Sequence, residues 1–449
     1  MLIDFLLDVF RENPDGEAIV WHDRSFSYGY LLEKVEGFQG LLSRADVPRG
    51  SVVALEADFS PAAAALFLAL LDHCCVLVPL TSSVRRRRDR FIAIAEAEIA
   101  ITIDADDRLD ITRLNATASH PIYQQLREQG HPGLVLFSSG STGEPKAAVH
   151  DFAPLLEKFQ VRRHRLRTIS FLLYDHIGGI NTMLYVFSNG GCLVTVPDRS
   201  PDGVLRACSR HRVELLPTTP TFLNLILISE AYRHYDLGCL RTITYGTEPM
   251  QESTLRRVCE VFPDVRVLQT YGLSEVGILR SKSKSSDSLW VKIGGEGFDT
   301  RVVDGVLHIK ARSAMLGYLN APSPFTEDGW MNTGDRVEVD GEYIRFQGRE
   351  SEVINVGGEK VFPAEVESVI LDMDDVADVV VFGEDHPIVG QIVCARVTQR
   401  SEKPAKALVA ELKKFCRERL RRYKVPVKVE ISQEYQHGSR FKRMRRRNA

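Results

Sequence analysis

A loop rich in serine, glycine and threonine contains the residue types that hold phosphate groups. It lies in residues 134–150, which read LVLFSSGSTGEPKAAVH and begin with an apolar run that predicts a buried strand. The loop-type residues after this run are Ser138, Ser139, Gly140, Ser141, Thr142, Gly143, Glu144, Pro145 and Lys146. Glycines let the backbone turn tightly and bring its N–H groups close to an anion, the hydroxyls add donors, and Lys146 adds a positive charge. We therefore predict a polyphosphate site.

Phosphate-releasing NTPases use a different loop, G-x-x-x-x-G-K-[ST], which opens a helix. In this chain Lys146 follows a proline, and no hydroxyl residue follows Lys146 directly. A serine- and glycine-rich hairpin loop without a ligand is the alternative interpretation, but nine consecutive loop-type residues directly after a strand favour a binding loop. The pattern resembles the phosphate loop of the adenylate-forming enzymes, a family that includes acyl-CoA synthetases, luciferases and the adenylation domains of peptide synthetases.

Two further motifs are similar to those of this family and follow in the expected order. The sequence YGLSE at 271–275 resembles the family's YGxTE motif, with serine in place of threonine. The resemblance implies that Tyr271 packs on adenine and that Glu275 helps to hold Mg²⁺, together with a loop hydroxyl such as that of Ser138. The sequence YGTEP at 245–249 resembles the loop that borders the adenine and the acyl pocket. The nucleotide-binding residues implied by the two motifs are Gly246, Thr247, Glu248, Pro249, Tyr271, Gly272 and Ser274.

Two charged residues are predicted to bind the ribose of ATP. The stretch FTEDGWMNTGD at 325–335 resembles the family's motif that ends in an aspartate, here Asp335. A carboxylate accepts hydrogen bonds from two neighbouring hydroxyl groups, which suits a ribose. The stretch FQGRESEVINVGGEKVFPAEVE at 346–367 resembles the family's hinge and the start of its small domain, and it implies that Arg349 also reaches the ribose. The resemblance covers the chain from about Ser27 to Arg445.

The basic end of the chain contains a candidate catalytic lysine. The family uses a lysine in a G-K-x-x-R context to bridge the carboxylate and the α-phosphate. Lys442 and Arg445 match K-x-x-R, but three residues separate Gly438 from Lys442. The alternative interpretation is a disordered basic tail. At the hinge, Ser351 stands where many relatives have aspartate or lysine.

His176 is a candidate gate between the phosphate loop and the acyl pocket, as in many acyl-CoA synthetases. The alternative interpretation is a structural histidine at a strand-to-helix corner. Relatives that activate amino acids have an aspartate that Asp175 does not match in position. We therefore predict an acid without an α-amino group. The stretches expected to line the acyl pocket are 177–183, 217–223, 245–247 and 276–279.

The element pattern predicts an α/β fold. Short β-branched or apolar runs, among them a strand predicted at 169–173, alternate with helical patterns, such as 61–71, 203–211 and 250–261, which favours layered, mostly parallel sheets. From residue 295 onward, shorter alternating runs joined at Asp304-Gly305 and Asp340-Gly341 predict antiparallel hairpins and a small β-barrel-like subdomain. We expect a large N-terminal domain at 1–348 and a small mobile α+β C-terminal domain at 349–449, with the hinge near 349–352.

Composition agrees with such an enzyme. The chain has 449 residues and a formal net charge of −3, so bulk charge favours neither nucleic acid nor a membrane surface. No apolar run is long enough to span a membrane. The eight cysteines include no C-x-x-C pair, which disfavours a zinc site and predicts reduced thiols in a cytoplasm.

The resemblance implies a two-step reaction. A carboxylic acid attacks the α-phosphate of ATP, pyrophosphate leaves, and the acyl-adenylate passes its acyl group to a thiol. The predicted catalytic residues are Lys146, His176, Glu275 and Lys442. The acceptor is coenzyme A, the phosphopantetheine of a carrier protein in trans, or an amine. The alternatives are a stand-alone amino-acid adenylation enzyme and an amide-forming ligase, and the less favoured ones are a phosphate-releasing NTPase and a non-catalytic relative.

Overall fold

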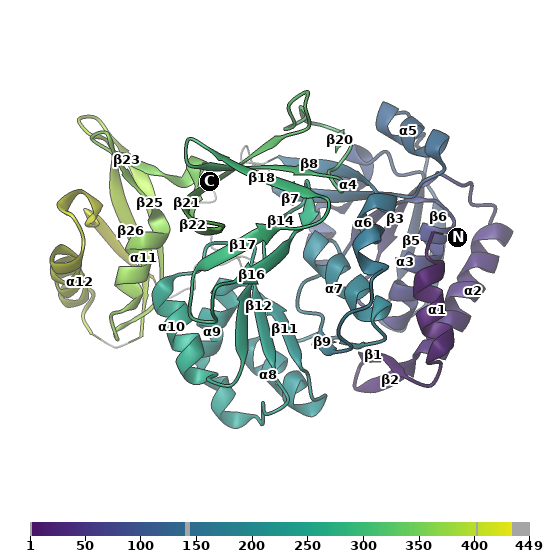
Figure 1. Ribbon diagram of the computed structural model, residues 1–449, viewed down its shortest axis with the longest axis horizontal. Coiled ribbons are helices and arrows are strands. Elements are labelled where there is room, and N and C mark those ends of the chain that lie inside the picture. Colours follow the sequence, from purple (N-terminus) through teal and green to yellow (C-terminus); the bar gives the residue numbers. More distant parts are fainter. Residues whose placement is uncertain (1, 140–143, 401–402, 433–449) are drawn as a thin grey trace.

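Two seven-stranded sheets form the large N-terminal part of the protein. The computed structural model describes residues 2–139, 144–400 and 403–432 (Figure 1). The first sheet has the order β20-β8-β7-β4-β3-β5-β6, with parallel pairing from β7 to β5 and antiparallel strands at both edges. Its strands are β3 (Val52–Glu56), β4 (Val76–Leu80), β5 (Ile99–Ile103), β6 (Leu109–Arg113), β7 (Gly133–Ser139), β8 (Pro145–Asp151) and β20 (Gly317–Tyr318).

The second sheet has the order β13-β12-β11-β9-β10-β1-β2 and is parallel except for the β1–β2 hairpin at its edge. Its strands are β1 (Glu17–Trp21), β2 (Arg24–Ser27), β9 (Arg167–Ile169), β10 (Cys192–Val194), β11 (Leu215–Thr218), β12 (Thr242–Tyr245) and β13 (Arg266–Gln269). The predicted layered, mostly parallel α/β architecture is therefore confirmed.

Helices pack against both sheets, and their ends follow local sequence signals. The side chains of Ser60 and Thr219 accept hydrogen bonds from backbone N–H groups at the starts of α3 and α9, and a proline occupies the first position of each helix. Helix α3 is buried along its length except for its last residue, because it lies within the main apolar core. The helices of this part are α1 (Asp4–Glu12), α2 (Tyr28–Arg44), α3 (Pro61–Asp72), α4 (Arg88–Ile94), α5 (Pro121–Gln129), α6 (Phe152–Leu156), α7 (Ile177–Ser188), α8 (Pro201–Arg210), α9 (Pro220–Ser229) and α10 (Glu252–Val261).

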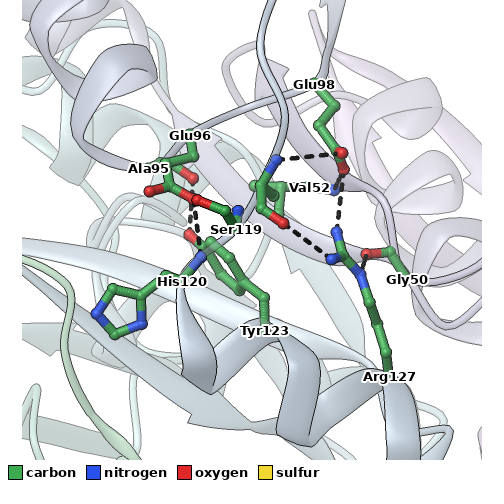
Figure 2. A network of polar contacts seen from close by, with 10 residues as sticks. Gly50, Val52, Ala95, Glu96, Glu98, Ser119, His120, Tyr123 and Arg127 are labelled. Carbon is green, nitrogen blue, oxygen red and sulfur yellow. Dashed lines mark hydrogen bonds and ion pairs between the residues drawn. The ribbon is translucent and has the colours of Figure 1, made fainter.

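A polar network attaches α5 to the parallel strands of the first sheet (Figure 2). Glu98 accepts hydrogen bonds from the backbone N–H of Val52 at 3.0 Å and from the Arg127 guanidinium at 3.3 Å. Arg127 also donates to the carbonyl of Gly50 at 3.1 Å. Because α5 leads directly into β7, this network fixes the start of the strand that ends at the serine- and glycine-rich loop.

A six-stranded antiparallel sheet follows, in the order β16-β17-β22-β21-β19-β18. Both predicted hairpins are present: Asp304 and Gly305 have positive φ angles of 51° and 77° between β18 and β19, and Gly341 has a φ of 59° between β21 and β22. The strands are β16 (Arg280–Ser283), β17 (Trp290–Gly294), β18 (Phe298–Val303), β19 (Val306–Ala311), β21 (Met331–Asp340) and β22 (Tyr343–Arg349), preceded by the small hairpin β14 (Gly272–Leu273) and β15 (Gly277–Ile278).

The C-terminal part has its own apolar core and contacts the second sheet's helices (Figure 1). Helix α11 lies beside α10, where Arg256 and Asp372 form an ion pair at 2.6 Å and Gln251 donates to the buried Glu367 at 3.3 Å. The domain boundary near 349–352 stays a prediction. The elements of this part are β23 (Ile354–Val356), β24 (Glu359–Val361), α11 (Pro363–Leu371), β25 (Val376–His386), β26 (Gly390–Gln399), α12 (Ala405–Arg419) and β27 (Lys428–Ser432).

One predicted strand differs from the structure. The apolar run at 169–173 predicts a strand, but β9 ends at Ile169. Residues after Ser170 leave the sheet and run toward the start of α7, where Leu172, Leu173 and His176 line a small cavity. Within the described residues, no helix combines the length and apolarity needed to cross a membrane.

Candidate functional site

A cavity of about 160 Å³ lies where four of the predicted motifs meet. One wall is the segment after β12, the second is the segment after β13, and the third is formed by β21 and β22. The lining residues are Gly246, Thr247, Glu248, Pro249, Gln269, Thr270, Tyr271, Gly272, Leu273, Asp335, Phe346, Gly348, Arg349 and Glu352. Segments about 100 residues apart in sequence therefore line one cavity.

An aromatic pair and an ion pair are among the residues that line this cavity. The ring of Tyr271 stacks on Phe346, with centroids 4.6 Å apart and an interplanar angle of 17°. The Tyr271 hydroxyl donates to Asp335 Oδ2 at 2.6 Å, and Arg349 Nε lies 3.2 Å from Asp335 Oδ1. Burial raises the pKa of Asp335, while Arg349 and Tyr271 oppose this shift. The arrangement presents a carboxylate and a guanidinium beside an aromatic surface.

The strands place these side chains by register. Asp335 and Arg349 are directly opposite each other in the antiparallel β21–β22 pair, so their side chains share one face. The backbone N–H of Asp335 also donates to the Thr333 hydroxyl at 3.0 Å. The backbone of Tyr271 is held by the Ser281 hydroxyl at 3.2 Å, which accepts from the Tyr271 N–H.

The segment after β12 approaches the neighbouring strand closely at Gly246. A Cβ atom at this position would lie 2.7 Å from the carbonyl oxygen of Thr270, so a side chain does not fit without backbone movement. Thr247 follows with a φ of 76°, an uncommon conformation for a residue with a side chain. Glu248 accepts a hydrogen bond from the backbone N–H of Thr221 at 2.8 Å, at the start of α9. This contact gives Glu248 a structural partner in addition to its place at the cavity.

Glu275 and Lys146 meet at Tyr318. The Tyr318 hydroxyl donates to Glu275 Oε1 at 2.6 Å, and Lys146 Nζ lies 5.3 Å from the centroid of the Tyr318 ring. His150 supports the same loop from β8, because its Nε2 lies 2.5 Å from the carbonyl oxygen of Ser274. Burial lowers the pKa of His150, which keeps the imidazole neutral at pH 7. The Glu275 carboxylate is thus held by Tyr318, and the backbone of the preceding residue, Ser274, is held by His150.

These residues fit a Mg²⁺ ion bound with ATP. Mg²⁺ in such sites is held by one or two oxygen ligands from the protein and by the phosphates of the substrate. In the described part of the chain, Oε2 of Glu275 has no hydrogen-bond partner, whereas Oε1 accepts from Tyr318. Ser138 is opposite Lys146 in the β7–β8 pair, at the end of the strand that leads into the loop. The Glu275 carboxylate and the Ser138 hydroxyl are the oxygen ligands that these described residues offer to the ion.

Part of the predicted site lies outside the described residues. Gly140, Ser141, Thr142 and Gly143 of the loop and Lys442 of the basic end belong to this part. Ser139 is the last residue of β7, so the strand before the loop is as predicted.

His176 lies at the start of α7 and shares a small cavity with Thr247, Asp175 and Arg199. Its Nδ1 accepts a hydrogen bond from the backbone N–H of Gly178 at 3.0 Å and caps the helix. The histidine therefore has the structural function of the alternative interpretation, and it also borders the segment that leads to the nucleotide cavity.

Sequence reasoning did not identify three supporting residues. Phe346 and Tyr318 lie in stretches that match the family, but their partners, Tyr271 and Glu275, are far away in sequence. His150 closes the printed loop sequence at 134–150, yet its contact to Ser274 depends on tertiary packing. The available signal for His150 was a polar side chain directly after the apolar residues 147–149, within the same strand.

Comparisons with known proteins agree with this geometry. The profile of the AMP-binding enzyme family matches residues 7–319, and that of the AMP-binding enzyme C-terminal domain matches residues 365–442. The chain is 26% identical to an indoleacetate–CoA ligase of Aromatoleum aromaticum, over 93% of this chain and 91% of that protein.

Solved structures share the fold. The anthranilate CoA ligase AuaEII in complex with anthranoyl-AMP superposes with a TM-score of 0.81 at 19% identity, covering 98% of this chain and 95% of that chain. The amide bond synthetase McbA from Marinactinospora thermotolerans has a TM-score of 0.75 at 22% identity, covering 97% and 96%. With its motifs gathered around one cavity and the family profile matching more than half of its length, the chain belongs to the adenylate-forming family of AMP-binding enzymes.

Proposed function

We propose that this protein uses ATP to convert a carboxylic acid into an acyl-adenylate, with release of pyrophosphate, and then transfers the acyl group to a thiol. The observation that carries the proposal is the set formed by Tyr271, Asp335 and Arg349 around the cavity, close to the loop that holds Glu275. The set combines an aromatic surface for a base with a carboxylate for two hydroxyl groups.

Each residue has a distinct function in the first step. Tyr271 packs against the adenine, and Asp335 accepts hydrogen bonds from the ribose hydroxyls while Arg349 orients the carboxylate. Lys146 neutralises phosphate charge next to the serine- and glycine-rich loop. A Mg²⁺ ion held by Glu275 and Ser138 supplies further neutralisation of the phosphates when it is bound. The protein contributes mainly positioning and electrostatic stabilisation, so no covalent enzyme intermediate is required.

Lys442 is proposed to bridge the substrate carboxylate and the α-phosphate. A carboxylate that attacks a phosphate brings two anions together, and one cation at about 4 Å contributes about 4 kcal/mol at an effective dielectric constant near 20. Such a contribution corresponds to a rate change of about a thousandfold. We expect Lys442→Ala to lose acyl-adenylate formation by about this factor while it still binds ATP. Normal adenylation by this variant would show that another residue carries the bridging charge.

Coenzyme A is the acceptor that we favour, because the full-length relative named above is an indoleacetate–CoA ligase. An amine acceptor is the second candidate, supported by the structural likeness to the amide bond synthetase McbA. A carrier-protein phosphopantetheine is the third. All eight cysteines are free thiols, which fits a reducing compartment such as the cytoplasm.

A panel of acids tests the proposal. Pyrophosphate release is measured with ATP, Mg²⁺ and each acid, first alone and then with coenzyme A, with a phosphopantetheinylated carrier protein, or with an amine. We expect AMP and pyrophosphate with at least one apolar carboxylic acid, and a thioester with coenzyme A. Release of orthophosphate instead of pyrophosphate would refute the proposal.

A further inference from the structure

A second cavity, of about 200 Å³, lies apart from the nucleotide cavity and shares no lining residue with it. Its walls come from α7, from residues just after α6, and from the segment that joins β15 to β16. On α7 the lining positions Asn181, Tyr185 and Ser188 follow the spacing of one helix face. The other lining residues are Lys158, Phe159, Val161, Arg163, Asn189, Ile278, Leu279, Arg280 and Ser281.

The charged residues of this cavity all have the same sign. Lys158, Arg163 and Arg280 line it, and among the residues that the structure describes no aspartate or glutamate does. In the part of the chain that the structure describes, no carboxylate forms an ion pair with any of these three cations. The neighbouring Arg162, in contrast, forms an ion pair with Glu12 at 2.5 Å.

Lys158 is the central donor of the cavity. Its ammonium group donates to the carbonyl of Ile278 at 3.1 Å and lies 5.1 Å from the centroid of the Phe159 ring. These two contacts use only part of its donor capacity, since an ammonium group has three N–H donors. Burial, followed by repulsion from Arg163, lowers the pKa of Lys158 to about 7. The repulsion indicates that the two cations are close enough to act on each other.

We propose that this cavity binds a small oxyanion, either a carboxylate or an inorganic anion such as sulfate or phosphate, through Lys158 and Arg163. An anion between the two cations replaces their repulsion with two attractions. The side chains of Ser188 and Asn189 already donate to the carbonyl of Tyr185, and that of Ser281 donates to the carbonyl of Leu279, so the cations are the donors on which the proposal rests. Three cations without a lining carboxylate, rather than the charge of a single side chain, indicate the class of ligand.

Two sources can supply such a group. One is a free inorganic anion, and this source is independent of the function proposed above. The other is a second carboxylate at the far end of the substrate acid, and this source rests on the proposed function. It is considered because Asn181, Ile278 and Leu279 belong to stretches that the sequence predicts to line the acyl pocket.

Calorimetric titration of the full-length protein with sodium sulfate at pH 6.5 tests the binding site. We expect Lys158→Met to weaken sulfate binding by about tenfold or more, the factor that loss of one charge-assisted hydrogen bond produces. Lys34→Met is the matched control, because Lys34 Nζ lies 5.5 Å from the Tyr30 ring on α2, outside the cavity. Equal sulfate affinity of wild type and Lys158→Met, or absence of sulfate binding by the wild type, would overturn the proposal.

The pH dependence gives a readout that a purely structural lysine does not produce. Sulfate keeps its charge between pH 6.5 and 8.5, and the charged groups that share the cavity with Lys158 are Arg163 and Arg280, while Tyr185 adds a phenol to the lining. Because the pKa of Lys158 is about 7, wild-type affinity falls by about tenfold or more over this range as the lysine loses its proton. Lys158→Arg keeps its charge and is expected to bind sulfate with a much flatter pH profile. If Lys158→Met does not fold, Arg163→Gln replaces it and is expected to weaken binding as well.

The acid panel distinguishes the two sources. If the anion belongs to the substrate, sulfate inhibits pyrophosphate release with α,ω-dicarboxylic acids but not with monocarboxylic acids of equal length. If the anion is free, sulfate affects both series equally. Sulfate binding that depends on Lys158 but occurs in an inactive protein would refute the proposed function while supporting the oxyanion site.

Discussion

Replacement of Asp335 separates binding of the ribose from stability of the fold. Asp335 is 9% exposed and its carboxylate accepts from Tyr271 at 2.6 Å, so water cannot easily replace its hydrogen bonds. Hydrogen bonds to a charged group contribute about 1.5–3 kcal/mol each, and the proposed ribose contact has two of them. We therefore expect Asp335→Ala to lower kcat/KM for ATP by about a hundredfold or more.

Whereas Asp335→Ala is expected to lose activity, the amide variant Asp335→Asn is expected to keep or gain stability. Burial raises the pKa of Asp335 above its value in the unfolded chain, although Arg349 acts against this shift. The contribution of a group with a raised pKa is fully present at low pH and is lost as the pH rises through that pKa. Above that pKa the ionised carboxylate thus lowers the free energy of unfolding relative to low pH. Asp335→Asn, which resembles the neutral form, is expected to unfold at an equal or higher denaturant concentration than the wild type.

The assay compares ATP with 2′-deoxy-ATP by pyrophosphate release. The wild type is expected to use the deoxy nucleotide less efficiently, whereas Asp335→Ala is expected to use both nucleotides with nearly equal kcat/KM, because the partner of the hydroxyl is absent. Asp340→Ala is the control, since Asp340 lies on the same strand but pairs with Lys284 at 3.3 Å on the surface. An unchanged penalty for the deoxy nucleotide in Asp335→Ala would refute the assignment.

Three further predictions concern residues that position the site. Tyr318→Phe removes the hydrogen bond to Glu275 and is expected to lower kcat by about tenfold and to raise the Mg²⁺ concentration required for activity. Pyrophosphate release over a Mg²⁺ series measures both effects. Unchanged Mg²⁺ dependence would contradict the function given to Glu275. Gly246→Ala places a Cβ 2.7 Å from a backbone carbonyl, so the backbone has to move, and both a higher KM for ATP and a lower unfolding midpoint are expected; an unchanged KM and midpoint would contradict the close approach. His150 has a lowered pKa, so its contribution to stability is present above its unfolded value near 6.5 and is lost as the pH falls. Denaturant titrations between pH 7.5 and 5.5 are expected to show a smaller pH dependence for His150→Asn than for the wild type, and equal slopes would contradict this.

The α/β alternation and the hairpins were predictable because they depend on local signals. Apolar runs of strand length predict strands, and the turn residues Asp304-Gly305 predict a hairpin, because each determines the backbone conformation of only a few neighbouring residues. The strand predicted at 169–173 was wrong because its apolar residues continue beyond the sheet and line a cavity. An apolar residue in the sequence predicts that its side chain is buried, but it does not predict which part of the protein covers that side chain.

The sequence by itself determined the family, the order of the motifs and the residue types around the nucleotide, since these depend on short stretches with a fixed chemistry. Only the tertiary structure decided which side chains support them. The stacking of Phe346 on Tyr271 and the contacts of Tyr318 and His150 to the segment 274–275 join segments that are distant in the chain. The cations that line the cavity with Lys158 likewise become a group only when α7 and the β15–β16 segment pack together. Such contacts depend on register and packing between elements, which no single stretch of sequence contains.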